Sequence, residues 1–299
     1  MEQQPSIIWD QGSAYDLFAS LLIIHRPEEF GLRASWAAGV RSRLPIVLRD
    51  TLDLSQKFMN VPLNFIYHLP EPKSAQSAIK VLEDLSPEDR LPALFFSSRT
   101  DRDIQDFQHF LLDLEGKQRL TASIESKIKE RYKNSNRLAK GFTRALFEGW
   151  SDRKAFGEIY LEALKAYAKN FFEEEGPRIL PAQTEALETA KAMAEQKDLI
   201  SLVEELSEGV RLDWVSDVSQ VVMAPSFWAA PFVIFNRIDD STGIIVFGAR
   251  PKGTTLVPGE LVPEDLLNAL KSLADPTRLR ILRYLRDGPA TTNDLAKFL

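Results

Sequence analysis

The sequence contains no cysteine and only three histidines among its 299 residues. Soft metals are bound mainly by thiolates, so a thiolate metal sensor is excluded, and the absence of cysteine fits a reducing compartment. Long apolar runs are also missing, because stretches such as 21–24 and 229–235 are too short to span a bilayer. The N-terminal residues lack the basic and apolar regions of a signal peptide. We therefore expect a cytoplasmic protein with no membrane partner.

Catalytic motifs are absent as well. The sequence has no G-x-G-x-x-G, P-loop, H-E-x-x-H or G-x-S-x-G motif. His109 is the only histidine with ionisable neighbours at helical spacing, since Asp106 and Asp113 share its helix face. These three side chains could offer ligands to a metal, but a solvated polar face opposite Phe107 is the interpretation we favour. We expect no enzymatic activity, no cofactor and no metal.

The overall composition, with 44% hydrophobic and 27% charged residues, is typical of a soluble globular protein. Apolar residues at helical spacing predict helices through most of residues 13–208, including one opened by a capping box of Ser13 and Asp16. Gly176-Pro177 predicts a helix stop. Runs of β-branched and aromatic residues predict strands. The predicted strands are 7–9, 218–223, 231–235 and 244–247, and we expect them to form one small antiparallel sheet.

The fold class predicted is therefore mainly α with a small antiparallel β element, followed by a C-terminal partial winged helix-turn-helix. Residues 1–250 are expected to form a sensor or oligomerisation domain. Residues 251–262 are rich in proline and glycine and are expected to form a linker. Residues 263–299 form the last predicted domain.

The C-terminal domain is predicted from its capping and periodicity. Asp275 is placed to cap a helix whose first residue is Pro276, and Gly288 is placed to end it. A second amphipathic helix is predicted over 264–274, and Thr291 opens a third. Three short helices joined by tight turns have the layout of a helix-turn-helix.

The residues ALKSLADPTRLRILRYLRDGPATTNDLAKFL resemble the first half of the winged helix-turn-helix of ArsR-type bacterial transcriptional regulators, over 263–299. An ordinary amphipathic helix pair is the alternative. The N-terminal region is similar to an uncharacterised helical domain that precedes some members of this family. The recognition helix and β-wing of the family would follow Leu299. The resemblance implies a scaffold made of Asp275, Pro276, Thr277, Arg278, Leu279 and Ile281.

The same resemblance implies a homodimer, paired through 264–274, that binds double-stranded operator DNA. The first helix of such a motif crosses the DNA backbone, so Thr291, Thr292 and Lys297 are expected near phosphate. The sequence therefore predicts a transcriptional regulator of the repressor type, under the control of an unknown signal, for which a small-molecule effector is one candidate. The alternative is a ligand-binding or protein-interaction protein with a degenerate helix-turn-helix.

Two further stretches are open to more than one interpretation. Phe227 and Trp228 lie in an aromatic, proline-bounded segment that predicts either an effector pocket or packing against helices, which we favour. Residues 127–144 carry seven basic residues and one acid. They predict either an anion or nucleic-acid surface or, as we favour, the exposed side of two helices.

Overall fold

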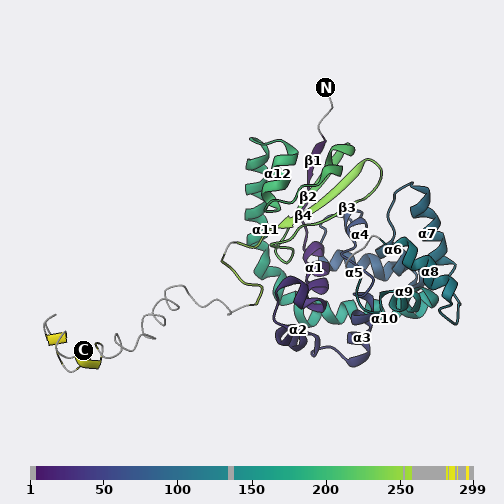
Figure 1. Ribbon diagram of the computed structural model, residues 1–299, viewed down its shortest axis with the longest axis horizontal. Helices are drawn as coiled ribbons and strands as arrows, with labels where there is room; N and C mark the ends of the chain where they lie inside the picture. Colours follow the sequence, from purple (N-terminus) through teal and green to yellow (C-terminus); the bar gives the residue numbers. More distant parts are fainter. Residues whose placement is uncertain are drawn as a thin grey trace. The chain divides into compact units, whose positions relative to one another are not determined.

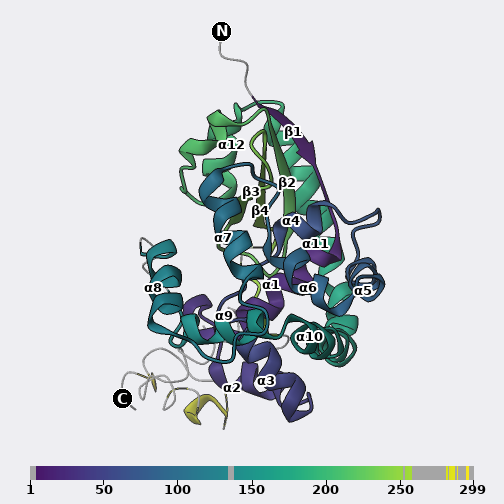
Figure 2. The same ribbon diagram turned by 90° about the vertical axis from the view of Figure 1, so that its right-hand side faces the viewer.

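The computed structural model describes residues 5–133, 138–251 and 253–257, together with 281, 283–286, 288 and 294–295. The chain divides into two compact units, Met1–Lys252 and Gly253–Leu299. The first unit places a small sheet at one end and a layer of helices at the other (Figures 1 and 2). The mainly helical fold with a small sheet is confirmed. Its helical elements, in chain order, are α1 (Ser13–His25), η1 (Pro27–Phe30), α2 (Ala34–Arg41), α3 (Ile46–Ser55), α4 (Leu63–Tyr67), α5 (Ala75–Asp84), α6 (Pro87–Phe95), α7 (Arg102–Leu112), α8 (Ala122–Arg131), α9 (Phe142–Ser151), α10 (Arg153–Tyr167), η2 (Ala168–Phe172), α11 (Glu173–Ala194), α12 (Leu199–Leu206) and η3 (Asp213–Asp217).

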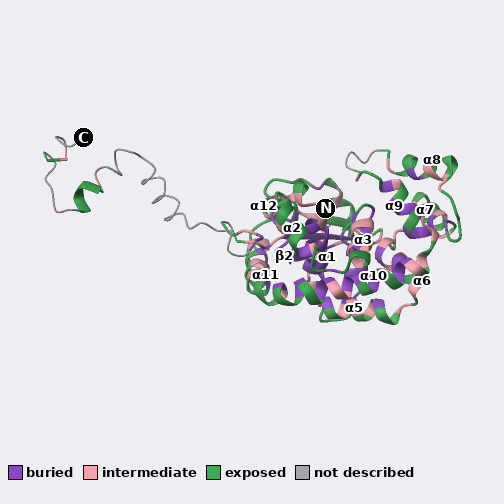
Figure 3. Ribbon diagram, turned by 90° about the horizontal axis from the view of Figure 1, so that it is seen from below, coloured by how far each residue is buried: buried purple, intermediate pink, exposed green. Residues whose placement is uncertain are grey.

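Helix α1 lies at the centre of this unit. Its residues from Ala14 to Ile24 are all buried, because apolar side chains occupy every face of the helix. Figure 3 shows α1 and β2 buried among helices whose outer faces are exposed. The predicted capping box is wrong: the cap residue is Gly12, and Asp16 points into the core with no exposed surface. The Ser13 hydroxyl instead accepts a hydrogen bond from Ala75 N at 3.0 Å.

The described strands form one four-stranded mixed sheet in the order β1-β2-β4-β3. β1 (Ser6–Trp9) is parallel to β2 (Gln220–Ser226), and β2 is parallel to β4 (Thr242–Gly248). Only β3 (Ile234–Arg237) pairs antiparallel, with β4. The prediction of an antiparallel sheet is therefore wrong. The reason lies in β2 and β4, which are buried continuously rather than on alternate residues, as is usual for parallel strands with both faces covered.

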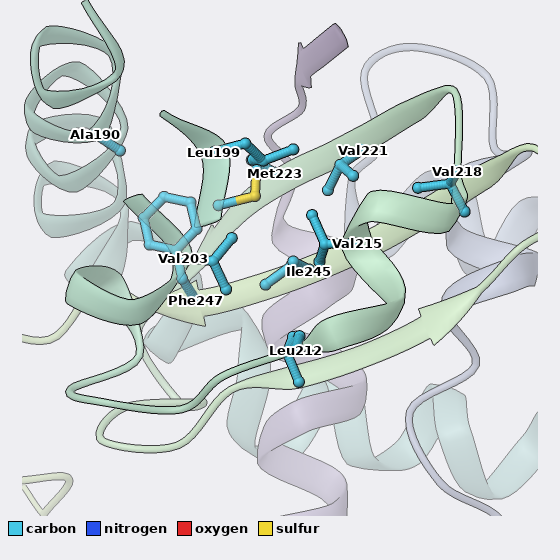
Figure 4. Close-up of a cluster of buried hydrophobic side chains, with 10 residues drawn as sticks. All are labelled: Ala190, Leu199, Val203, Leu212, Val215, Val218, Val221, Met223, Ile245 and Phe247. Carbon is cyan, nitrogen blue, oxygen red and sulfur yellow. The ribbon is translucent and has the colours of Figure 1, made fainter. Parts of the chain in front are cut away.

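One face of the sheet packs on α11, α12 and η3. Successive strand residues point to opposite faces, and Val221 and Met223 of β2 join Ile245 and Phe247 of β4 on this side. Figure 4 shows these side chains facing the helices. On the other side, β2 contacts α1, and Val222 is fully buried there. The apolar cluster on the first face consists of Ala190, Leu199, Val203, Leu212, Val215, Val218, Val221, Met223, Ile245 and Phe247.

The predicted helix stop at Gly176-Pro177 is also wrong. The chain passes from α10 through a π-helical turn, η2, into α11, which contains Pro177 and Pro181. A proline ring crowds the carbonyl four residues earlier, here that of Glu173, and η2 changes the hydrogen-bond pattern just before this residue. The helical region is interrupted instead between α11 and α12, where the Asp198 side chain caps the new helix by accepting a hydrogen bond from Ser201 N at 3.0 Å.

In the second unit, residues 281 and 283–286 are helical, as are 294–295. Gly288 has a φ of 155°, a conformation that favours glycine, and its N–H donates to the Leu285 carbonyl at 3.3 Å. None of the described helices is both long and apolar enough to cross a membrane. Most of the predicted helix-turn-helix lies outside the described residues.

Candidate functional site

A cavity of about 850 Å³ opens within the first unit. Pockets that bind small molecules usually occupy about 300–1,000 Å³, so this one is large enough for a small organic ligand. Its walls come from segments far apart in the sequence: the end of α1 with η1, residues 57–64, residues 94–99, α7, and the ends of α8 and α9. Asn236 of β3 completes the lining.

Aromatic side chains line one wall of this cavity. Phe107 and Leu111 of α7 are one helical turn apart and both face inward. The Phe107 ring meets Tyr132 edge to face at 5.8 Å, and Tyr132 meets Phe142 in the same way at 4.7 Å. These contacts join α7 to α8 and α9. The wall therefore has a fixed arrangement of rings rather than a loose apolar lining.

The charged groups at the cavity are mostly cationic. Arg26, Lys57, Arg99 and Arg131 line it, against the single carboxylate of Glu29. Arg99 pairs with Asp101, outside the lining, at 2.6 Å. No ion pair of Arg26, Lys57 or Arg131 occurs within the part of the chain that the structure describes. The cavity is thus positive in a chain whose net charge is −6.

Two of these cations, Arg26 and Arg131, are held in place by contacts other than ion pairs. Arg26 Nε donates to the Gln56 carbonyl at 3.1 Å, and burial lowers the Arg26 pKa while the group remains protonated. The Arg131 guanidinium lies 5.7 Å from the centre of the Phe107 ring, within the range of a cation–π contact. Each arginine therefore has an ordered side chain with donors left for a ligand.

Tyr132 supplies a polar group on the aromatic wall. Burial raises the pKa of its hydroxyl to about 12, against a smaller lowering effect of Arg131. The phenol is neutral at physiological pH, and its hydroxyl has no hydrogen-bond partner among the described residues. It can therefore donate one hydrogen bond into the cavity.

A second group of polar side chains lies at the carboxyl ends of β1 and β2, where parallel sheets often bind ligands. In this protein these side chains are buried, and they form hydrogen bonds and an ion pair with one another. Lys73 pairs with Asp10, and the Tyr15 hydroxyl donates to the same carboxylate at 2.8 Å. Asp16 accepts from the Ser226 hydroxyl and from Trp228 N, at 2.8 and 2.7 Å. Because these groups satisfy one another, the cluster joins segments of the core rather than opening to a ligand.

The predicted effector residues lie in the core. Phe227 is 4% exposed and Trp228 is fully buried. Trp228 stacks on Trp36 with ring centres 6.3 Å apart, and its indole N–H donates to Glu175 at 3.1 Å. Neither residue lines the 850 Å³ cavity. The contacts are those of packing against helices, and an effector pocket at Phe227 and Trp228 stays a prediction.

The basic stretch divides between the surface and the cavity. Lys129, Lys133 and Arg144 form ion pairs with Glu125, Glu130 and Glu148 at 2.6, 2.6 and 2.8 Å. Among the described residues of this stretch, Arg131 is the basic residue that lines the cavity, together with Tyr132, Leu138, Ala139 and Phe142. The alternation of basic and aromatic residues in this stretch was the available signal for the site. Nothing in the sequence pointed to Arg26, Lys57 or Arg99.

The remaining predicted sites are placed as follows. The acidic and imidazole side chains around His109 form no cluster of three or more metal-ligand residues, a statement that covers the described ranges. Ile281 is the one predicted scaffold residue inside those ranges, where it is helical and partly exposed. The others, and all three residues expected near DNA, lie outside the described residues; they are Asp275, Pro276, Thr277, Arg278, Leu279, Thr291, Thr292 and Lys297.

Comparison with known proteins gives no assignment. No family model matches the chain, and neither a curated protein nor a solved structure matches it. The resemblance of 263–299 to ArsR-type regulators therefore stays a prediction from the residues themselves.

Proposed function

We propose that the chain is a DNA-binding transcriptional regulator of the cytoplasm, a repressor that binds operator DNA as a homodimer. One observation supports this most directly. The residues that resemble a helix-turn-helix fall within their own compact unit, Gly253–Leu299, while the cavity lies within Met1–Lys252. A cavity in one unit and a DNA-binding element in the other is the arrangement that a ligand-controlled regulator needs.

In this proposal the segment 264–274 pairs with its twofold mate and sets the spacing of two half-sites. Thr291, Thr292 and Lys297 contact phosphate, which positions the protein without reading sequence. Bases are read by a recognition helix that, by the resemblance, would follow Leu299. The first unit controls the distance or orientation of the two copies through the ligand it holds.

The test uses the protein from the whole reading frame that encodes this chain. Genomic fragments retained by the protein are recovered, and their affinity is measured by fluorescence anisotropy across a range of salt concentrations. Each lost phosphate contact should reduce the slope of log K against log salt by about 1. We expect this reduction for Lys297→Ala.

The matched control is Lys191→Ala, which removes a partly exposed lysine of α11 paired with Glu188 at 2.8 Å. It should leave the slope unchanged. An unchanged slope in Lys297→Ala removes that residue from the interface. If no fragment is retained even at low salt, the DNA-binding proposal is wrong. The cavity would then favour the alternative, a ligand-binding or protein-interaction protein with a degenerate helix-turn-helix.

A further inference from the structure

We infer that the 850 Å³ cavity binds an organic anion that carries an aromatic ring. This site is independent of DNA binding, because all its lining residues belong to the first unit. Only the role of such an anion as the controlling effector rests on the proposed function. Three features of the cavity support the inference.

The first feature is charge. Arg26, Lys57 and Arg131 line the cavity and form no ion pair in the described part of the chain. Glu29 is the one acid in the lining, and its charge acts on Arg26 to oppose the lowering of the Arg26 pKa by burial. Positive groups around a partly enclosed space attract an anion. The attraction is strongest beside Arg26, which is partly buried, and weaker beside Lys57 and Arg131, which are exposed. A metal cation is disfavoured for the same reason.

The second feature is the aromatic wall. Phe107, Tyr132 and Phe142 form an edge-to-face series, with ring centres 5.8 and 4.7 Å apart. Phe107 and Phe142 are almost completely buried, and Tyr132 is partly buried, so this wall offers apolar aromatic surface in contact with little water. Such a surface suits another aromatic ring better than a small inorganic anion. Arg131 already stacks on Phe107, so it stands at the junction of the apolar wall and the charged region. An aromatic ring and an anionic group attached to it would meet both.

The third feature is the pattern of ion pairs along the basic stretch, residues 127–144. A nucleic-acid strand needs a continuous line of unpaired cations. Along this stretch Lys129, Lys133 and Arg144 are neutralised by glutamates on their own helices or one turn away. Lys127, Arg131 and Lys140 make no ion pair among the described residues, but paired cations separate them along the sequence. Arg131 is the one of these three that lines the cavity. A small molecule therefore fits the pattern of paired and unpaired charge better than a polymer.

The inference can be tested on the 299-residue chain with a fluorescent aromatic anion. The probe is 8-anilinonaphthalene-1-sulfonate, and its uncharged counterpart N-phenyl-1-naphthylamine is the ligand control. We expect saturable binding of the sulfonate, weakened by salt, and much weaker binding of the neutral amine. Displacement by 1-naphthoate or by 1-naphthyl phosphate then distinguishes a carboxylate head group from a phosphate.

Two variants of α8 provide the matched comparison. Arg131→Gln removes a cation stacked on Phe107 inside the cavity, and Lys127→Gln removes one stacked on Phe110 at 4.4 Å, one turn away and outside the lining. We expect about tenfold weaker probe binding in Arg131→Gln, equivalent to about 1.4 kcal/mol, and unchanged binding in Lys127→Gln. Circular dichroism and the thermal midpoint check that both variants are folded.

Lys57→Gln is the second cavity variant, since Lys57 is exposed and its loss disturbs no described ion pair. It should also weaken binding of the sulfonate. Equal binding of the anion and the neutral amine, or unchanged affinity in folded Arg131→Gln and Lys57→Gln, would overturn the inference. DNA retention is measured separately, so that a failure of the cavity and a failure of the regulator proposal give different results.

Discussion

Asp16 shows how one side chain joins distant parts of this chain. Its carboxylate is fully buried and accepts hydrogen bonds from Gln183 of α11 and from Ser226 and Trp228, at and just beyond the end of β2. Burial raises its pKa to about 6, although the hydrogen bonds act in the opposite direction. In the sequence Asp16 has the position of a helix-capping acid, so the pattern predicted an exposed role.

The raised pKa of Asp16 predicts that the free energy of unfolding depends on pH. In the unfolded chain the Asp16 pKa is about 3.9, so between about pH 4 and pH 6 the folded protein holds a proton that the unfolded chain does not. The contribution of Asp16 to the free energy of unfolding must therefore fall as pH rises through this window. Two pKa units correspond to about 3 kcal/mol.

Asp16→Asn isolates this contribution. Asparagine is neutral at every pH, and the Gln183 amide can turn to offer it an oxygen. Urea denaturation at pH 4, 5, 6 and 7 should show the wild-type stability, relative to the variant, falling by about 3 kcal/mol over this range. Burial lowers the His25 pKa, which gives the opposite pH dependence, but His25 is present in both proteins and cancels. If the difference in free energy of unfolding between the wild type and Asp16→Asn does not change with pH, the Asp16 pKa is not raised.

At the scale of elements, the close approach of α6 and α10 depends on one glycine. A Cβ atom added to Gly157 would lie 2.0 Å from the Pro87 carbonyl oxygen, which is far inside contact distance. Buried Arg90 bridges the same helices, because its Nη1 donates to the Gly157 carbonyl at 3.2 Å. Gly157→Ala must push the helices apart, and overpacking of this kind costs about 1–3 kcal/mol, sometimes more.

We therefore expect Gly157→Ala to lower the free energy of unfolding by about 3 kcal/mol in urea denaturation, with an unchanged m-value. The control is Gly39→Ala in α2, where no atom lies within 4 Å of the new Cβ. Alanine has the higher helix propensity, so this change should stabilise the protein by about 0.5–1 kcal/mol. Equal stability of Gly157→Ala and the wild type would contradict the close packing of α6 on α10.

The sequence predicted elements better than it predicted their connections. Helical periodicity predicted helix through most of 13–208, and β-branched runs placed three strands close to β1, β2 and β4, because both signals are local. The fourth predicted strand, 231–235, overlaps β3 only at 234–235. Parallel pairing depends on which distant strands meet, and neither signal contains that information. Pro177 indicated a helix end on local grounds, but η2 and the packing of Phe171 and Phe172 in the core outweigh it.

The cavity could not be predicted for a related reason. Its walls combine segments more than a hundred residues apart, and Arg26, Lys57 and Arg99 have no common spacing in the sequence. Arg131 and Tyr132 were visible as part of a basic and aromatic stretch, yet three cations of that stretch, Lys129, Lys133 and Arg144, form ion pairs with neighbouring glutamates instead. Among the described residues, only the folded chain distinguishes Arg131, which lines the cavity, from the other cations of the stretch.

At the scale of the whole molecule, the two ends of the chain have different structural roles. β1 lies along β2 with Ile7 opposite Val221, and Asp10 N donates to the Met223 carbonyl at 3.0 Å. Trp9 packs on the apolar cluster between the sheet and α12. The first strand therefore closes a sheet whose other strands come from the end of the same unit. The chain beyond Lys252 belongs to a separate compact unit.

Two deletions test this asymmetry. Removing residues 253–299 leaves every described strand and its partners in place, so the thermal midpoint should stay within about 3 °C of the full chain, and binding of the aromatic anion should be retained.

Removing residues 1–9 is a much smaller change, but it exposes one edge of β2 and the apolar cluster beneath Trp9. We expect that protein to lose cooperative unfolding or to melt at least about 10 °C lower in circular dichroism. If the C-terminal deletion were the more damaging of the two, the first unit would not be an independent folding body. The cavity and the helix-turn-helix segment would then have to be treated as parts of one domain.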